Sequence, residues 1–302
     1  MARFGQILTA MVTPFDAGGR LDLDAAAALA RHLQQEGNDG IVVAGTTGES
    51  PVLSDDERLD LFRAVIEAVT IPVVAGSGTN DTRHSVEMTE RATEMGAAGI
   101  LAVAPYYNRP SQAGLAAHMR AIAECTHLPV MVYDIPVRTG RKIATSVILE
   151  LARSVDNIVA LKDAAGSPGE TAKLISEAPA GFEVYSGDDA LTLPLLAVGA
   201  VGAVGVATHW TTPDHRQMFE LLAKGDLEGA RAVNARMLES FSFETGDDAP
   251  NPLPTKAMMN FLGHRVGDAR LPMGPAPAAV HEAAPGVWER LRAARAAFDG
   301  GR

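Results

Sequence analysis

The feature that most constrains the fold of this 302-residue chain is a repeated unit, in which a short apolar run is followed by a stretch with helical character. Each run is rich in Val, Ile, Ala and Leu, and the runs recur roughly every 20–35 residues, the length of a strand–helix unit. Near-continuous apolar character is typical of strands in a parallel sheet whose two faces are both buried. The eight runs lie at residues 7–12, 40–44, 71–75, 99–104, 129–133, 158–161, 182–185 and 201–207.

Eight such units predict an α/β fold, a (β/α)₈ TIM barrel with extra C-terminal helices. We assign residues 1–226 to the catalytic barrel and residues 227–302 to a C-terminal helical extension. An open, doubly wound sheet is the alternative, but no glycine fingerprint for a dinucleotide follows the first run. Residues 54–57 and 167–170 are typical of capping boxes, and the Thr-Pro pair at 212–213 predicts the start of a later helix.

Composition and charge exclude several classes of protein. Hydrophobic residues make up 47% of the chain, which supports a large core and argues against disorder. A net charge of −11 without a basic cluster argues against nucleic acid or an anionic membrane as a partner. The single cysteine, Cys125, allows no intrachain disulfide, and no signal-peptide core follows the N-terminal residues, so we expect a cytoplasmic protein. Residues 190–208 are uncharged, but Pro194 and three glycines favour a buried helix and strand over a membrane span.

One predicted strand end carries a lysine, and the active site of a barrel lies at the carboxyl ends of its strands. Lys162 directly follows the sixth apolar run. Burial there disfavours the ammonium form, lowers the pKa of the amine and makes it a nucleophile for carbonyl carbon. The alternative is a structural lysine whose charged end reaches the surface or pairs with Asp163.

The ends of other runs carry hydroxyl, phenol and guanidinium groups. Condensation of Lys162 with a ketone would give an imine, and loss of a proton would give an enamine that attacks an aldehyde. A tyrosine beside the nitrogen could move the protons, Arg138 could bind one carboxylate, and the Thr46-Thr47 pair could bind another. These groups predict an aldolase that uses a 2-keto acid. The side chains concerned are Thr46, Thr47, Tyr106, Tyr107, Tyr133 and Arg138.

Other chemistries lack the residues that they need. The eight histidines are scattered without a tight pair, so the sequence does not predict a metal site, and we expect no metal and no other cofactor. No Gly-x-Ser-x-Gly elbow of a serine hydrolase is present. A structural role could explain each strand-end residue singly, but it explains less well why all of them fall at strand ends.

Several motifs carry a resemblance that covers almost the whole chain. On these motifs the chain resembles the dihydrodipicolinate synthase family, within the pyruvate-dependent class I aldolases that include N-acetylneuraminate lyase. The Thr46-Thr47 pair and Arg138 in a Tyr-x-x-Pro-x-Arg pattern favour the synthases over the sialic-acid and sugar-acid relatives. The motifs are residues 9–15 (TAMVTPF), 45–49 (GTTGE), 105–108 (PYYN), 133–140 (YDIPVRTG) and 270–273 (RLPM), together with Lys162.

The resemblance implies a reaction and a role for each site residue. The reaction would be the condensation of pyruvate with L-aspartate 4-semialdehyde to 4-hydroxy-tetrahydrodipicolinate, on the route to diaminopimelate and lysine. Lys162 would form the Schiff base, and Tyr133 would be the general acid/base in a relay with Thr47 and Tyr107. Arg138 would bind the carboxylate of the aldehyde substrate. The pyruvate pocket would be lined by Thr46, Gly187 and Val204.

The resemblance also implies an assembly. Members of this family are usually homodimers or homotetramers, the tetramer being a dimer of tight dimers. The tyrosine that matches Tyr107 comes from the neighbouring subunit in the family, so Tyr107 would act in trans. Asp134 and Val137 differ from the residues most often found at these positions of the synthase motif, and we interpret both as tolerated variants.

A larger departure concerns regulation. Lysine-inhibited members bind the inhibitor partly through histidine and glutamate side chains, whereas the aligned residues here are Asp55, Arg58 and His84. Only Ser50, Asn80 and Tyr106 remain in kind. We therefore predict weak or absent inhibition by lysine.

Two alternatives to the synthase remain open. One is another Schiff-base aldolase or lyase of the same fold that acts on a sugar acid, sialic acid or hydroxyproline-derived acid. The other is a catalytically silent barrel that binds a keto acid. The presence of Lys162, Tyr133 and Tyr107 together favours an enzyme, because binding alone needs no proton relay.

Overall fold

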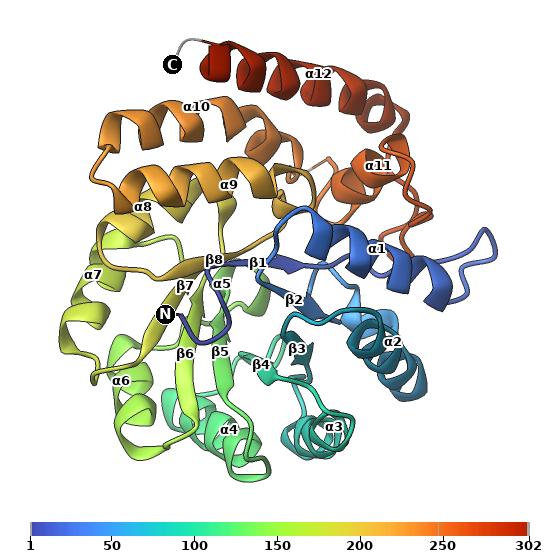
Figure 1. Cartoon of the computed structure of the whole chain (residues 1–302). Helices are drawn as coiled ribbons and strands as arrows, with labels where there is room; N and C mark the ends of the chain where they lie inside the picture. The colour runs from blue at the N-terminus through green and yellow to red at the C-terminus, as the bar shows by residue number, and fades with distance from the viewer. Residues whose placement is uncertain (1, 247, 301–302) are drawn as a thin grey trace.

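Eight parallel strands close into a barrel in chain order, with β8 paired to β1, in a computed structural model that describes residues 2–246 and 248–300 (Figure 1). The predicted TIM barrel is therefore confirmed. Each predicted run overlaps one strand, and the strand ends differ from the predicted ones by at most two residues. The strands are β1 (Ile7–Ala10), β2 (Gly40–Val43), β3 (Val73–Gly76), β4 (Gly99–Val103), β5 (Val130–Asp134), β6 (Ile158–Asp163), β7 (Glu183–Ser186) and β8 (Gly202–Gly205).

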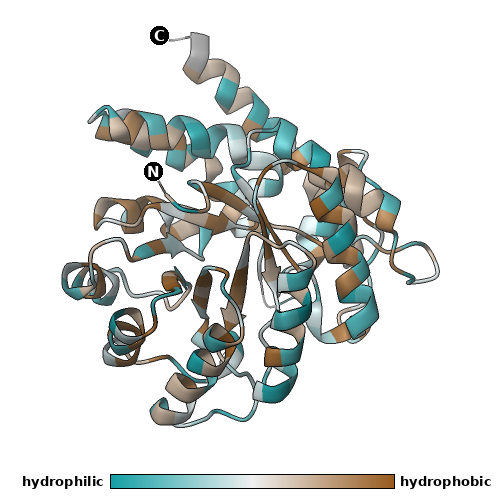
Figure 2. Ribbon diagram, turned by 60° about the horizontal axis from the view of Figure 1, so that its bottom comes forward, coloured by the Kyte–Doolittle hydropathy of each residue, from teal (hydrophilic) through white to brown (hydrophobic). Residues whose placement is uncertain are grey.

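Helices surround the barrel and connect successive strands (Figure 1). Figure 2 shows hydrophobic residues concentrated in the central strands, while the surrounding helices carry hydrophilic stretches. The helices up to residue 223 are α1 (Leu23–Gln35), α2 (Asp55–Ala68), α3 (Thr82–Glu94), α4 (Gln112–Glu124), α5 (Pro136–Thr139), α6 (Thr145–Ser154), α7 (Pro168–Glu177), α8 (Thr192–Ala197) and α9 (Thr208–Ala223), with short 3₁₀ turns η1 (Ser50–Val52) and η2 (Asp189–Leu191).

Local signals explain where some helices begin and where the sequence misleads. The predicted capping box of α2 is present, because Ser54 and Glu57 exchange hydrogen bonds between side chain and backbone. The box predicted before α7 is wrong: the Ser167 side chain makes no capping bond, and Glu170 instead pairs with Lys142 at 3.0 Å. The ion pair holds the glutamate away from the helix end that a capping box would require.

The predicted start of a helix at residues 212–213 is also wrong. Helix α9 begins at Thr208, so Pro213 lies inside the helix. The helix accommodates this proline in its second turn, where the missing N–H leaves the carbonyl of His209 without its helical partner. The uncharged segment 190–208 contains α8, a turn at Gly199 with a positive φ, and β8, as predicted. Within residues 2–246 and 248–300, none of the helices combines the length and the apolarity that crossing a bilayer would require.

The interior of the barrel is a small apolar core that ends in polar groups at the carboxyl ends of the strands. Its members include Leu8, Val42, Met131 and Val204, all fully buried. Successive side chains of a strand point to opposite faces, so Lys162 faces the interior while its neighbours on β6 face the helices. Lys162 is thus placed where an ammonium group loses most of its hydration.

The remaining helices pack onto α9. They are α10 (Leu227–Phe243), α11 (Leu253–Phe261) and α12 (Ala278–Gly300). Helix α10 lies along α9, and α12 lies across α10 and α11 (Figure 1). Asp214 of α9 is buried and accepts hydrogen bonds from Arg236 of α10 at 2.7 Å and from Arg295 of α12 at 3.0 Å. Removing one member would leave a buried charge unpaired, so this triad ties the three helices together.

The division of the chain at residue 226 stays a prediction, and the last two residues of the predicted extension lie outside the described residues. Residue 226 falls between α9 and α10, and these two helices pack closely, so the barrel and the C-terminal helices are not separated in space at that point.

Candidate active site

Lys162 is the second-last residue of β6, and only 4% of its surface is exposed. Burial lowers the pKa of its amine to about 8, and the nearby Arg138 acts in the same direction while Asp189 opposes both. The amine lies 4.3 Å from the centroid of the Tyr133 ring. The alternative of a surface-reaching lysine is therefore wrong. A pair with Asp163 is not formed either, since Asp163 accepts hydrogen bonds from the backbone of Ala165 and the side chain of Thr171.

Gly187 leaves the space that the lysine side chain occupies. A Cβ atom at this position would lie 2.9 Å from Lys162 Cγ and 3.0 Å from Lys162 Cε, closer than ordinary van der Waals contact. The backbone N–H of Gly187 donates to the carbonyl of Asp163 at 2.8 Å, which fixes the glycine against β6. Any larger residue at position 187 must therefore displace the lysine side chain, while the predicted role of Gly187 in lining a pyruvate pocket stays a prediction.

Tyr133 stands opposite Lys162, because the two residues are register partners on β5 and β6. Burial raises the pKa of the Tyr133 phenol to about 12, while a hydrogen bond with Thr46 and the charge of Arg138 act against the rise. The phenol therefore keeps its proton at neutral pH and can donate it to a group bound at Lys162. The structure brings together three predicted residues here: Lys162, Tyr133 and Thr46.

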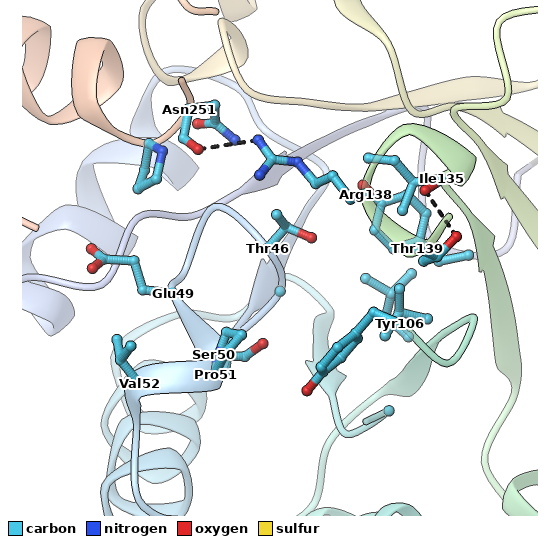
Figure 3. Close-up of a pocket in the computed structure, with 18 of the residues that line it drawn as sticks. Thr46, Glu49, Ser50, Pro51, Val52, Tyr106, Ile135, Arg138, Thr139 and Asn251 are labelled. Carbon is cyan, nitrogen blue, oxygen red and sulfur yellow. Dashed lines mark hydrogen bonds between the residues drawn. The ribbon is translucent and has the colours of Figure 1, made fainter. Parts of the chain in front are cut away.

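Thr47 and Arg138 share a partner that the sequence did not identify. The side-chain amide of Asn251 donates to Thr47 Oγ1 at 2.9 Å, and its backbone carbonyl accepts from Arg138 Nη2 at 3.1 Å (Figure 3). Asn251 lies between two prolines in the loop before α11. The flanking prolines restrict the backbone, and they are the sequence feature that could have indicated a fixed position for Asn251. In this structure the hydroxyl that interacts with Tyr133 is that of Thr46, and Thr47 is bound to Asn251.

A cavity of about 290 Å³ opens above these groups at the carboxyl ends of the strands (Figure 3). Thr46, Tyr133 and Arg138 line it, together with Tyr106 and Asn251. Its size suits one or two small organic acids. Five predicted residues do not line it: Lys162, Thr47, Tyr107, Gly187 and the fully buried Val204.

Tyr107 is the predicted site residue that a single chain does not bring to the site. Its side chain is 90% exposed and does not line the cavity. Its backbone has a φ of +73°, in the left-handed region that costs a residue other than glycine about 1 kcal/mol or more. The loop after β4 therefore holds this tyrosine in a strained conformation that projects it away from its own barrel.

The two departures from the motif at residues 133–140 leave the cavity untouched. Asp134 points away from the barrel interior, and its carboxylate accepts a hydrogen bond from the backbone of Ile143 at 3.1 Å. Val137 is exposed and does not line the cavity. Both residues thus fit the interpretation of tolerated variants.

The residues aligned with the inhibitor site of lysine-sensitive members lie beside the cavity. His84 Nε2 lies 2.8 Å from Asp55 Oδ1, and the buried Arg58 donates to the carbonyl of Ser50 at 2.8 Å. Ser50 and Tyr106 also line the cavity. The weak or absent inhibition by lysine stays a prediction, and the buried guanidinium of Arg58 is the group that would oppose the ammonium groups of lysine.

Comparisons with known proteins agree with this geometry. A model of the dihydrodipicolinate synthetase family matches residues 3–284. Among curated proteins, the 4-hydroxy-tetrahydrodipicolinate synthase of Moorella thermoacetica is 46% identical over 275 residues, which cover 90% of this chain and 92% of that protein. The synthase of Acidothermus cellulolyticus is 48% identical over 281 residues, which cover 92% of this chain and 89% of that protein.

Solved structures give the same result. The dihydrodipicolinate synthase of Cyanidioschyzon merolae, solved with lysine bound, superposes with a TM-score of 0.94 at 40% identity and covers 96% of this chain and 99% of that chain. A dihydrodipicolinate synthase of Bacillus anthracis has a TM-score of 0.92 at 40% identity, with the same coverage of both chains.

Proposed function

The chain belongs to the dihydrodipicolinate synthetase family, lyases that condense pyruvate with aspartate semialdehyde in lysine and diaminopimelate biosynthesis, and we propose that it does so through a Schiff base on Lys162. The observation that carries this proposal is a buried lysine with a pKa of about 8, facing a buried phenol across two barrel strands. A lysine that is partly neutral near physiological pH attacks a ketone without a metal ion.

The steps follow from the groups around Lys162. The neutral amine attacks the C2 carbon of pyruvate, and the carbinolamine loses water to give the imine. Loss of a proton from C3 gives an enamine, which forms a carbon–carbon bond with the aldehyde carbon of aspartate 4-semialdehyde. Tyr133 keeps its proton at neutral pH, so it supplies the proton that leaves with water and accepts protons in the later steps. The amino group of the former aldehyde substrate then attacks the imine carbon and displaces the Lys162 amine, which closes the ring to 4-hydroxy-tetrahydrodipicolinate and frees the lysine.

Substrate binding is assigned to the groups around the mouth of the cavity. Arg138 carries a planar guanidinium, which matches the carboxylate of the aldehyde substrate, and the Asn251 carbonyl holds it at 3.1 Å. Thr46 lines the cavity beside Tyr133 and fits the carboxylate of pyruvate. Gly187 leaves space for the Lys162 side chain, and Val204 belongs to the inner core of the barrel; we assign both to the pyruvate pocket.

The finer part of the proposal concerns assembly and location. Tyr107 completes the relay with Thr47 and Tyr133 only if a second copy of the chain supplies it, since its side chain is almost fully exposed in one copy. We therefore propose a homodimer, or a homotetramer of such dimers, that works in the cytoplasm. A free thiol at Cys125 is compatible with a reducing compartment.

Turnover of pyruvate with aspartate 4-semialdehyde by the wild type and by Lys162→Ala tests the nucleophile. Borohydride should trap pyruvate on Lys162 and leave Lys256 unlabelled, although Lys256 is also buried. Lys256 is the matched control because its amine is held in an ion pair with Glu49 at 2.8 Å. Trapping without turnover of aspartate 4-semialdehyde would indicate an aldolase with another acceptor, and binding without trapping would indicate a silent barrel.

Mixing two inactive variants tests the role of Tyr107 in trans. Lys162→Ala and Tyr107→Phe each lose activity, but a mixed dimer contains one site with both residues intact. Activity should therefore return when the two variants are unfolded and refolded together. No recovery, with mixed dimers shown to form, would contradict the proposal.

A further inference from the structure

Glu49 ends the GTTGE motif after β2 and has no role in the proposed reaction, yet it lines the cavity and is 4% exposed. Its Oε1 atom lies 2.8 Å from Nζ of Lys256 on α11, a residue that is 2% exposed. Its Oε2 atom accepts a hydrogen bond from the backbone N–H of Arg270 at 2.9 Å. Figure 3 shows the Glu49 carboxylate turned away from Tyr106. A buried ion pair therefore joins the rim of the barrel to the part of the chain after α10.

Lys256 is held in place by other contacts besides this ion pair. Its Nζ atom donates a hydrogen bond to the carbonyl of Asp268 at 2.9 Å and lies 4.3 Å from the centroid of the Phe15 ring. Burial lowers the pKa of the Lys256 amine, and the Glu49 carboxylate acts against this change. Within residues 2–246 and 248–300, Glu49 is the acidic side chain that pairs with this amine. Loss of either partner would leave a charge buried without its counterion.

The turn that Glu49 ends has a strained backbone. Ala44 at its start and Glu49 at its end have φ values of +52° and +55°, in the left-handed region that is unfavourable for residues other than glycine. Such conformations persist where the surrounding structure holds them. The hydroxyl of Thr13 donates to the carbonyl of Gly48 at 2.6 Å, and the backbone N–H of Glu49 donates to the carbonyl of Thr46 at 3.0 Å. The position of Glu49 is thus passed directly to Thr46.

We propose that the buried ion pair between Glu49 and Lys256 positions Thr46 for the carboxylate of pyruvate. Glu49 and Lys256 are then positioning residues, and this inference rests on the function proposed above, which assigns Thr46 to pyruvate. Lys256 does not line the cavity, and both carboxylate oxygens of Glu49 already face partners from the C-terminal part of the chain. The pair therefore acts on pyruvate through the backbone of the turn and not by contact.

A purely structural ion pair is the alternative, and it makes a different prediction. Breaking such a pair would reduce the fraction of folded protein, but the folded molecules would bind pyruvate as the wild type does. Breaking a positioning pair would weaken pyruvate binding in molecules that are fully folded. The pyruvate concentration at which capture on Lys162 is half-maximal separates the two cases, because it does not depend on the amount of folded protein.

Two variants break the ion pair in different ways. Lys256→Met removes the ammonium group from a position outside the cavity and leaves Glu49 with the backbone N–H of Arg270 as its donor. The double variant, Glu49→Gln with Lys256→Met, removes both charges and leaves no buried ion unpaired. Replacement of a buried ion pair by uncharged groups of similar volume is often neutral for stability. The double variant therefore keeps the test decisive if Lys256→Met alone fails to fold.

The readout is the rate of pyruvate capture on Lys162 in cyanoborohydride, which reduces the imine, measured by peptide mass spectrometry over a range of pyruvate concentrations. In both variants we expect the half-maximal concentration to rise roughly tenfold, because a hydrogen bond from Thr46 to the pyruvate carboxylate is weakened. The rate at saturating pyruvate should change little, because Lys162 and Tyr133 keep their places on β6 and β5. The melting temperature of each variant shows that the molecules assayed are folded.

Arg236→Met is the control for loss of a buried ion pair. Arg236 pairs with the buried Asp214 at 2.7 Å, and neither residue lines the cavity. This variant should lower the melting temperature and leave the half-maximal pyruvate concentration unchanged. An unchanged concentration in the double variant, or an equal rise in Arg236→Met, would overturn the positioning role alone. A wild type that captures no pyruvate would instead refute the Schiff-base function, and this inference with it.

Discussion

Gly187→Ala should test how far catalysis depends on the position of the Lys162 amine, because it displaces the amine without removing it. The new methyl group would lie 2.9 Å from Lys162 Cγ, 3.0 Å from Lys162 Cε and 3.0 Å from Ala164 Cβ. Ordinary carbon contacts begin near 3.5 Å, so the lysine chain must shift by roughly 0.5 Å or more. Ala164 Cβ is fixed to its backbone and cannot rotate away, so the flexible lysine chain gives way.

The expected loss follows from this displacement. A misplacement of about 1 Å can cost about 100-fold in rate, so a shift of half that size should lower kcat by roughly 10-fold. Overpacking of a tight interior costs about 1–3 kcal/mol of stability. The assay is steady-state turnover of pyruvate and aspartate 4-semialdehyde, with the melting temperature measured in parallel.

Gly169→Ala is the matched control, because a Cβ atom at Gly169 meets nothing within 4 Å. This glycine lies in the first turn of α7, where alanine is a better helix former by up to about 1 kcal/mol. Its activity should equal that of the wild type. If Gly187→Ala also turns over at the wild-type rate, the added methyl group does not displace the Lys162 amine, and the steric argument is wrong.

Further predictions concern pH, stability and binding. Pyruvate capture should rise with pH through about 8, where Lys162 loses its proton; a rate that does not change between pH 7 and 9 would contradict the lowered pKa. Lys162→Met should abolish turnover yet stabilise the fold by up to about 3 kcal/mol in denaturant unfolding at pH 7. The direction of this effect follows from the lowered pKa, because the folded chain binds fewer protons than the unfolded chain. The destabilisation of the fold by Lys162 is therefore complete below pH 8 and disappears as the pH rises past the ordinary lysine pKa of 10.5. Asn251→Ala should lower kcat/KM by roughly 10-fold because Thr47 loses its partner. Asn157→Ala, which frees three backbone carbonyls ahead of β5, should lower stability alone, and equal kinetic losses in both variants would rule out a specific role for Asn251. Lysine should inhibit weakly or not at all, and half-inhibition at low millimolar lysine would show that the buried Arg58 does not exclude it.

The sequence predicted the barrel because its signal is local. Each buried strand is a short apolar run, and parallel strands bring their carboxyl ends to one rim. Lys162, Tyr133, Thr46 and Arg138 could therefore be grouped from their positions after the runs. The wrong helix start at Pro213 and the missing capping bond of Ser167 have the same origin, since both residues are strong local signals that tertiary contacts override, although α7 does begin at Pro168 as predicted.

The parts of the site that were missed depend on chain segments distant in sequence. Asn251 contacts Thr47 from 204 residues away, and no pattern within either segment encodes that pairing. Tyr107 could be selected by type and motif, but its outward direction follows from a strained φ that the sequence does not reveal.

The bond between Asn251 and the rim of the barrel has a consequence for protein synthesis. A ribosome releases the chain from its N-terminus, so all eight strands emerge before Asn251 does. A nascent chain with a complete barrel would already carry its buried lysine, but Thr47 and Arg138 would lack the residue that fixes them. On the proposed mechanism, reactivity toward keto acids would precede control of the second substrate, and the last 52 residues of the chain would turn a reactive amine into a selective catalyst.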